Sequence, residues 1–137
     1  MFARKLIVQS RANAAQDLKN EIRAITSCSQ HNHENIVYVL SHFPMQNLIH
    51  YAIDMEFCEL TLADYIIGNQ DVVKKVSVIY NSTGIPNRDE KAVKWHSIGS
   101  IMRQICQGVS VIHSCNEIHR DLKPSNSEFP LRSRLTS

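Results

Sequence analysis

A short polar run, I-H-R-D-L-K-P-S-N at residues 118–126, carries the side chains best suited to chemistry in this sequence. It places a carboxylate (Asp121), an amine (Lys123) and an amide (Asn126) close together along the chain. The proline and serine inside the run prevent a helix from continuing, so these side chains are held on a loop. There the Asp and Asn could serve a substrate hydroxyl and a divalent metal ion, and the Lys could neutralise a phosphate. A plain polar turn after a helix is the alternative interpretation.

The run H-R-D-L-K-P-S-N resembles the catalytic loop of eukaryotic protein kinases, whose signature is H-R-D-L-x-x-x-N. Further segments resemble parts of that family in the same order, so the resemblance covers essentially residues 2–126. The D-L-K-P pattern is typical of Ser/Thr rather than Tyr kinases. The further segments are F-A-R-K at 2–5, similar to the V-A-x-K strand; the helix with Glu21, similar to the regulatory helix; H-E-N-I-V at 33–37, similar to the H-x-N-I-V run; and I-D-M-E-F-C at 53–58, similar to the strand that enters the hinge.

This resemblance implies an α+β fold that is part of a protein kinase domain. The chain would hold a partial small lobe, comprising the third strand, the regulatory helix, and the fourth and fifth strands. The hinge and the start of the helical large lobe, through the catalytic loop, would follow. We expect a partial kinase domain over residues 1–126, with 1–57 in the small lobe, 58–126 in the large lobe, a loop insertion at 68–94 and an unpatterned tail at 127–137.

The resemblance also implies ATP and Mg²⁺ as cofactors and the Ser or Thr hydroxyls of proteins as phosphate acceptors. Asp121 would act as catalytic base toward that hydroxyl, Lys123 would stabilise the transferring phosphoryl group, and Asn126 would hold a magnesium ion. Lys5 would contact the α- and β-phosphates of ATP, and Glu21 would orient this lysine through an ion pair. The remaining nucleotide-binding residues would be the gatekeeper Met55 and, at the adenine edge, the backbone of Glu56 and Cys58.

Several parts of a complete kinase domain do not occur in these 137 residues. Too few residues stand before Lys5 for a glycine-rich loop, and neither D-F-G nor A-P-E is found. The sequence therefore predicts little or no phosphoryl transfer by this chain alone, and whether it is itself an enzyme stays open. The alternative function is a truncated, catalytically inactive kinase product that acts only by binding. A small-molecule phosphotransferase fits less well, because those enzymes usually replace the Arg-Asp-Leu-Lys context.

Helices and strands must position these side chains, and apolar periodicity predicts where they lie. Asp17 lies one helical turn before Glu21 and is the alternative ion-pair partner of Lys5. The helix that carries both acids is predicted by an apolar stripe at Ala15, Leu18, Ile22 and Ile25. The other expected elements are strands at 2–8, 36–43 and 48–55, the last two joined as a hairpin, a brief helix at 60–67 and a long amphipathic helix from Trp95 to about Cys115.

Composition limits the classes of function. The formal net charge is +2 and the hydrophobic share is 43%, so neither a nucleic-acid partner nor a disordered chain is indicated. No apolar run approaches the roughly 20 residues that a membrane helix needs, and no secretory signal opens the chain. We therefore expect a soluble intracellular protein without a membrane or nucleic-acid partner, and the sequence does not distinguish cytoplasm from nucleus.

The cysteines are dispersed, and no C-x-x-C pair occurs among them. Free, buried thiols are the expected state in a chain without an export signal. A metal site at Cys28, His31 and His33 lacks a fourth ligand at suitable spacing, which favours a loop with incidental histidines. The four cysteines are Cys28, Cys58, Cys106 and Cys115.

Overall fold

The fold is seen in a computed structural model that describes residues 1–8, 14–29, 31–46, 49–81 and 90–129. The chain divides into two compact units. The first comprises residues 1–57 and 110–118, and the second comprises residues 58–109 and those from 119 onward. Lys5 and Glu21 therefore belong to the first unit, and the loop with Asp121 belongs to the second.

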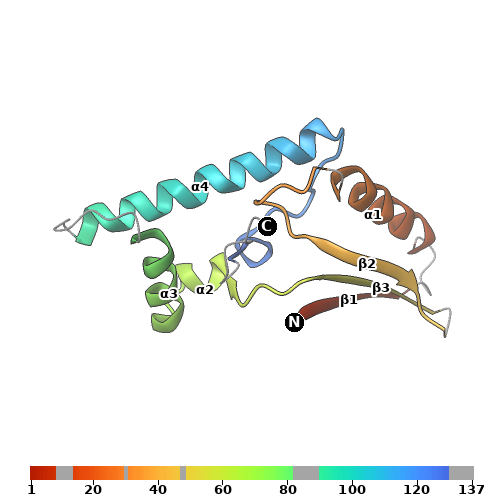
Figure 1. Ribbon diagram of the computed structural model, residues 1–137, viewed down its shortest axis with the longest axis horizontal. Coiled ribbons are helices and arrows are strands. Elements are labelled where there is room, and N and C mark those ends of the chain that lie inside the picture. Colours follow the sequence, from red (N-terminus) through yellow and green to blue (C-terminus); the bar gives the residue numbers. More distant parts are fainter. Residues whose placement is uncertain (9–13, 30, 47–48, 82–89, 130–137) are drawn as a thin grey trace. The chain divides into compact units, whose positions relative to one another are not determined.

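The first unit contains a three-stranded antiparallel sheet in the order β1-β3-β2 (Figure 1). Its middle strand is buried on both faces, since Ala52 is 0% exposed and Ile53 is 1% exposed. The strand expected at 48–55 is therefore an interior strand, because a neighbour on each edge and side chains on both faces exclude water from it. The strands are β1 (Phe2–Val8), β2 (Val39–Pro44) and β3 (His50–Glu56).

Helix α1 (Ala14–Ser29) lies alongside this sheet (Figure 1). Its apolar stripe is half-buried at Leu18, Ile22 and Ile25, as the helical spacing predicts. The helix is also tied to the segment that follows the long helix of the chain. Arg23 donates to both carboxylate oxygens of buried Glu117, from Nε at 2.7 Å and from Nη2 at 3.1 Å.

The second unit has a small apolar core made by residues from four different segments. Helix α2 begins at a capping box in which the Thr61 hydroxyl accepts from the Asp64 backbone and the Asp64 side chain accepts from Thr61. The elements are β4 (Leu60–Thr61), α2 (Leu62–Ile66), α3 (Gln70–Asn81), α4 (Glu90–Ser114) as far as residue 109, the 3₁₀ turn η1 (Pro124–Asn126) and β5 (Glu128–Phe129). The core consists of Leu60, Val72, Val76, Ile101 and Phe129.

The expectation of a loop over 68–94 is wrong at both of its ends, because helix α3 lies near its start and helix α4 already begins at Glu90. Helix α3 occupies Gln70–Asn81, and Val72 and Val76, one turn apart on that helix, are 6% and 0% exposed. The Asn69 side chain accepts from the backbone of the first helical turn and so starts the helix. Valine-rich sequence has a low helix propensity, and here burial of the apolar face overrides it. Residues 82–89 lie outside the described part of the chain.

The expectation of an unpatterned tail is also wrong at its start. Glu128 and Phe129 form strand β5, which pairs antiparallel with β4 in the register Leu60↔Phe129 and Thr61↔Glu128. Phe129 enters the core and is 7% exposed. A strand of two residues is too short to show a period in the sequence, so only its partner strand reveals it. Residues 130–137 lie outside the described part of the chain.

Helix α4 is amphipathic, but its apolar stripe is only partly covered. Ile101 is buried, Ile98 and Ile105 are half-buried, and Met102 is 52% exposed.

Within the described ranges, no helix is both long enough and apolar enough to cross a membrane.

All four cysteines are free thiols, as expected. The expectation that they are buried is wrong, because Cys106 is exposed on α4 and the other three are half-buried. Dispersed positions along the sequence do not reveal which side of a helix or loop a thiol occupies.

Candidate functional site

The first cluster of predicted site residues lies on the face of the sheet that α1 covers. Lys5 stands on β1 opposite Ile53 of β3, and its Nζ is 2.5 Å from Oε1 of Glu21 on α1. The structure thus joins Lys5 to Glu21, and the alternative partner Asp17 is exposed on the helix. The two side chains are 51% and 35% exposed, so the ion pair itself adds little to stability. An ammonium group has three donors, and the contact with Glu21 uses one of them.

On the opposite face of the same strand, Arg4 forms a second ion pair. Arg4 and Asp54 are directly opposed across β1 and β3, and two hydrogen bonds of 2.6 and 2.8 Å join the guanidinium to the carboxylate. The guanidinium also lies over the rings of Phe2 and Phe43, 5.5 and 5.4 Å from their centroids. Hydrogen bonds from Arg4 lower the pKa of Asp54, which is nearly buried. The pair fixes the register that places Lys5 on the α1 face.

Sequence reasoning did not identify this Arg4–Asp54 pair. The signal was present, because Asp54 is an acidic residue within a run of apolar strand residues, and such a buried charge needs a partner. Which cation supplies that partner depends on the strand register, which the sequence alone does not state.

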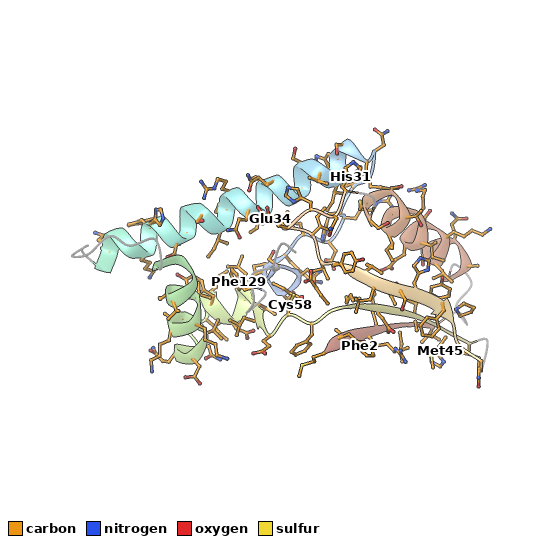
Figure 2. All side chains as sticks on the ribbon, in the orientation of Figure 1. Phe2, His31, Glu34, Met45, Cys58 and Phe129 are labelled. Carbon is orange, nitrogen blue, oxygen red and sulfur yellow. The ribbon has the colours of Figure 1, made fainter. Side chains whose placement is uncertain are left out.

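The end of β3 holds the residues expected to bind the adenine ring. Met55 is half-buried on this strand, opposite Ala3 of β1. The backbone N–H of Glu56 donates to the carbonyl of Tyr38 at 2.9 Å, and the Glu56 carboxylate accepts from the Tyr38 backbone at 2.7 Å. An adenine contact by the Glu56 N–H would therefore have to displace the Tyr38 carbonyl. Cys58, which is labelled in Figure 2, is half-buried and is the first residue of the second unit.

The second cluster lies on the loop after α4 and gathers all three residues predicted there. The Lys123 ammonium is 2.8 Å from Oδ2 of Asp121. The Asn126 side-chain N–H₂ donates to the same oxygen at 2.9 Å and to the Asp121 backbone carbonyl at 3.0 Å. A carboxylate, an amine and an amide therefore form one hydrogen-bonded group. The polar-turn interpretation explains the loop but does not require this convergence on one oxygen.

Local backbone geometry builds this cluster. Arg120 has φ of +61°, a conformation that reverses the chain just before Asp121. The Asp121 N–H donates to the His119 carbonyl at 2.8 Å, and the Asn126 N–H donates to the Lys123 carbonyl at 2.9 Å in the turn η1. The loop is then anchored to the core of its unit, because the Leu62 N–H donates to the carbonyl of the residue after Asn126 at 2.7 Å.

The electrostatics of the loop favour an ionised Asp121. Its hydrogen bonds from Lys123, and then from Asn126, lower the pKa of the carboxyl below its usual range. The Asp121 side chain is 62% exposed, so a substrate can approach the carboxylate. The site thus presents a negative oxygen that can accept a proton or a hydrogen bond, next to an ammonium group.

The loop also supplies oxygen donors of the kind that Mg²⁺ prefers. Because the Asn126 N–H₂ group faces Asp121, the amide oxygen Oδ1 is the atom of that side chain that can ligate a metal ion. Magnesium sites commonly use one or two protein oxygen ligands and complete the octahedron with water and phosphate oxygens. Asn126, with the Asp121 carboxylate next to it, fits such a partial set of ligands.

Known protein kinases are similar in sequence to this chain. The sequence matches the family model of the protein kinase domain over residues 1–127. It is similar to the serine/threonine-protein kinase ksp1 of Schizosaccharomyces pombe, with 28% identity over 107 residues that make up 77% of this chain and 19% of that protein. The chain thus spans about a fifth of the length of this relative. Because the family model matches nearly the whole chain and the fold is the α+β arrangement of part of that domain, this protein belongs to the protein kinase family.

Proposed function

We propose that this chain provides the catalytic loop and the nucleotide-anchoring lysine of a protein Ser/Thr kinase. The observation that carries the proposal is the convergence of Lys123 and Asn126 on one carboxylate oxygen of Asp121. Phosphoryl transfer needs mainly positioning and positive charge around the transferred group, and this loop holds groups suited to both.

In this proposal Asp121 is the catalytic base. Its lowered pKa keeps the carboxylate ionised at neutral pH, so it can accept a hydrogen bond from a Ser or Thr hydroxyl and take the proton as the new bond to phosphorus forms. Lys123 is close enough to Asp121 to contact the oxygens of a phosphoryl group that reacts at that hydroxyl. Asn126 would hold Mg²⁺ through Oδ1, and the bound ion would neutralise phosphate charge.

The first unit would contribute the nucleotide anchor. Glu21 holds the Lys5 ammonium by one contact, and the other donors of that group can bind the α- and β-phosphates of ATP. Met55 would line the adenine pocket as gatekeeper, and the backbone of Glu56 and Cys58 would bind the adenine edge. Each of these assignments is tested by nucleotide affinity.

The test is titration of the purified chain with a fluorescent ATP analogue in the presence of Mg²⁺. Lys5→Ala removes the phosphate anchor and should weaken nucleotide affinity about tenfold or more, the effect of losing a charged hydrogen bond. Lys19→Ala is the matched control, because it removes an exposed lysine of the same unit from helix α1. Equal affinities of the two variants would show that Lys5 has been assigned the wrong role.

The nucleotide titration, combined with a phosphorylation assay on a Ser/Thr peptide library, separates the two candidate functions. Nucleotide binding together with phosphorylation of a Ser/Thr peptide library would support catalysis by these residues. Binding of nucleotide or of a protein partner without any phosphoryl transfer would support the alternative, a kinase-family chain that acts only by binding.

A further inference from the structure

Two thiols and an imidazole meet at one place in the first unit, away from the residues assigned to phosphoryl transfer. Cys28 lies in the last turn of α1, His31 follows that helix, and Cys115 directly follows α4. Cys115 Sγ is 3.6 Å from Nδ1 of His31, and the backbone N–H of His31 donates to the Cys28 carbonyl at 3.1 Å, so both cysteines lie next to this histidine. Figure 2 shows His31 next to the end of α4.

The two thiols are chemically different. Burial, and then the hydrogen bond with Cys115, raises the pKa of Cys28 to about 11, and the negative charge of Glu117 acts in the same direction. Cys28 therefore stays protonated at neutral pH. Cys115 contacts the imidazole, which can accept the thiol proton at Nδ1. Since the thiolate is the reactive form of cysteine, Cys115 is the better nucleophile of the two.

We propose that Cys28 and Cys115 form a peroxide-reactive thiol pair that closes to a disulfide between the end of α1 and the segment after α4. The oxidant is a small hydroperoxide, with hydrogen peroxide as the simplest member. The site is a modification site, and it does not depend on whether the protein transfers phosphate.

The chemistry balances in two steps. The Cys115 thiolate attacks one peroxide oxygen, the O–O bond breaks, and the products are a sulfenic acid on Cys115 and one water after proton transfer. Cys28 sulfur then attacks the Cys115 sulfur, the S–O bond breaks, and a second water leaves as the disulfide forms. Two thiols lose two electrons, and one peroxide gains them. The second step is helped because the sulfenic acid no longer carries the Cys115 charge that disfavours the Cys28 thiolate.

The surrounding structure keeps the two sulfur atoms together. The Arg23–Glu117 ion pair joins the same helix to the same segment, with Glu117 two residues after Cys115. Both thiols are half-buried, so a small peroxide can reach them while a large thiol reagent is hindered. Cys106 is more exposed, but it lies on the part of α4 that belongs to the second unit.

Closure of the disulfide would add a covalent link to the helix that bears Glu21. It would also constrain the unfolded chain, because residues far apart in sequence become joined. The oxidised chain should therefore resist unfolding more than the reduced chain.

The test treats the full 137-residue chain with a small excess of hydrogen peroxide, blocks the remaining thiols with N-ethylmaleimide and maps the peptides by mass spectrometry. We expect a Cys28–Cys115 cross-linked peptide as the main product, with Cys58 and Cys106 alkylated. The same treatment in concentrated guanidinium is the control, and it should lose this preference. A cross-link that forms no more often than chance pairing of four cysteines, or equally often in denaturant, would overturn the proposal.

Three variants separate the steps. Cys28→Ser removes the resolving thiol and should leave a Cys115 sulfenic acid that a 1,3-dicarbonyl probe captures. His31→Gln removes the proton acceptor and should slow loss of the Cys115 thiol about tenfold or more. Cys106→Ser is the matched control and should leave both the product and its rate unchanged. Unchanged kinetics in His31→Gln, or capture of the probe at Cys106 instead of Cys115, would contradict the assigned roles.

Discussion

The Lys5–Glu21 pair and the Asp121–Lys123–Asn126 cluster are assembled in different ways. The first joins a strand to a helix within one unit, and it depends on the register of β1 against β3 and on the placement of α1. The second lies within a single loop, where backbone hydrogen bonds and a turn bring the side chains together. Damage to the core should therefore disturb the first cluster more than the second.

The two clusters also differ in what holds their charges. Beside Lys5, the strand is anchored by the ion pair of Arg4 with buried Asp54, and two aromatic rings lie against the Arg4 guanidinium. In the loop, Asp121 and Lys123 are both at least half exposed. Exposed pairs are screened by salt and contribute little to stability, whereas covered pairs are screened less. The loop is thus suited to exchange its partners for a substrate, and the strand is suited to hold its geometry.

The largest expected effect comes from Asp121→Asn, which removes the proposed base from the loop and leaves its shape nearly intact. We expect any phosphoryl transfer that this loop supports to fall at least about 100-fold, since a positioned base commonly contributes that much. Incorporation of labelled phosphate into a Ser/Thr peptide measures it. Glu128→Gln, an exposed acid of the same unit, is the control and should retain activity. Equal activities of the two variants would exclude Asp121 as the base.

The next prediction concerns the apolar core of each unit, on which the position of its cluster depends. Ile53→Ala should lower the free energy of unfolding by about 2–5 kcal/mol, because Ile53 is 1% exposed and its loss leaves a cavity beneath Lys5. Val76→Ala in the second unit should cost about 2 kcal/mol. Urea unfolding gives the magnitudes, and hydrogen exchange shows which unit opens. Leu6→Ala and Val78→Ala are exposed controls that should cost less than about 1 kcal/mol. Similar losses in core and control variants would contradict the assigned cores.

A smaller effect is the acid dependence of the Arg4–Asp54 pair. Because the folded pKa of Asp54 lies below its unfolded value, the stabilisation is complete above the usual aspartate pKa of about 3.9 and is lost as the pH falls through the lowered folded value. Asp54→Asn should destabilise the chain at neutral pH and reduce the loss of stability on acidification. Unfolding midpoints measured between neutral and strongly acidic pH test this. Asp17→Asn, on the exposed face of α1, should keep the wild-type acid dependence.

The smallest effect concerns the loop. Lys123→Ala removes the main cause of the lowered pKa of Asp121, so that pKa should rise toward the usual value while Asn126 retains part of the shift. Carboxyl chemical shifts followed through an acid titration give the change directly. High salt should reproduce part of the change in the wild-type chain, since the pair is exposed. A pKa of Asp121 that responds to neither treatment would show that Lys123 does not stabilise the carboxylate.

Much of the fold was predictable from local pattern. The helical stripe of Leu18, Ile22 and Ile25 predicts α1, and the motif around Asp121 predicts a polar loop after a long helix. Helix α3 was not predicted from the sequence. Its apolar face can be identified only from the burial of Val72 and Val76 in the folded unit. Strand β5 was not predicted either, since a strand of two residues is too short to show an alternation of apolar and polar side chains.

The sequence by itself indicated the family, the three polar side chains that meet in the loop and the candidate partners of Lys5, because these follow from residue types in short motifs. Tertiary structure decided which acid Lys5 contacts, which cation neutralises Asp54, and that Cys115 meets both Cys28 and His31. The physical reason is the separation along the sequence between the residues that make each contact. Spacing along a helix or loop fixes which near neighbours share a face, whereas contacts between distant residues depend on strand register and on the packing of whole elements.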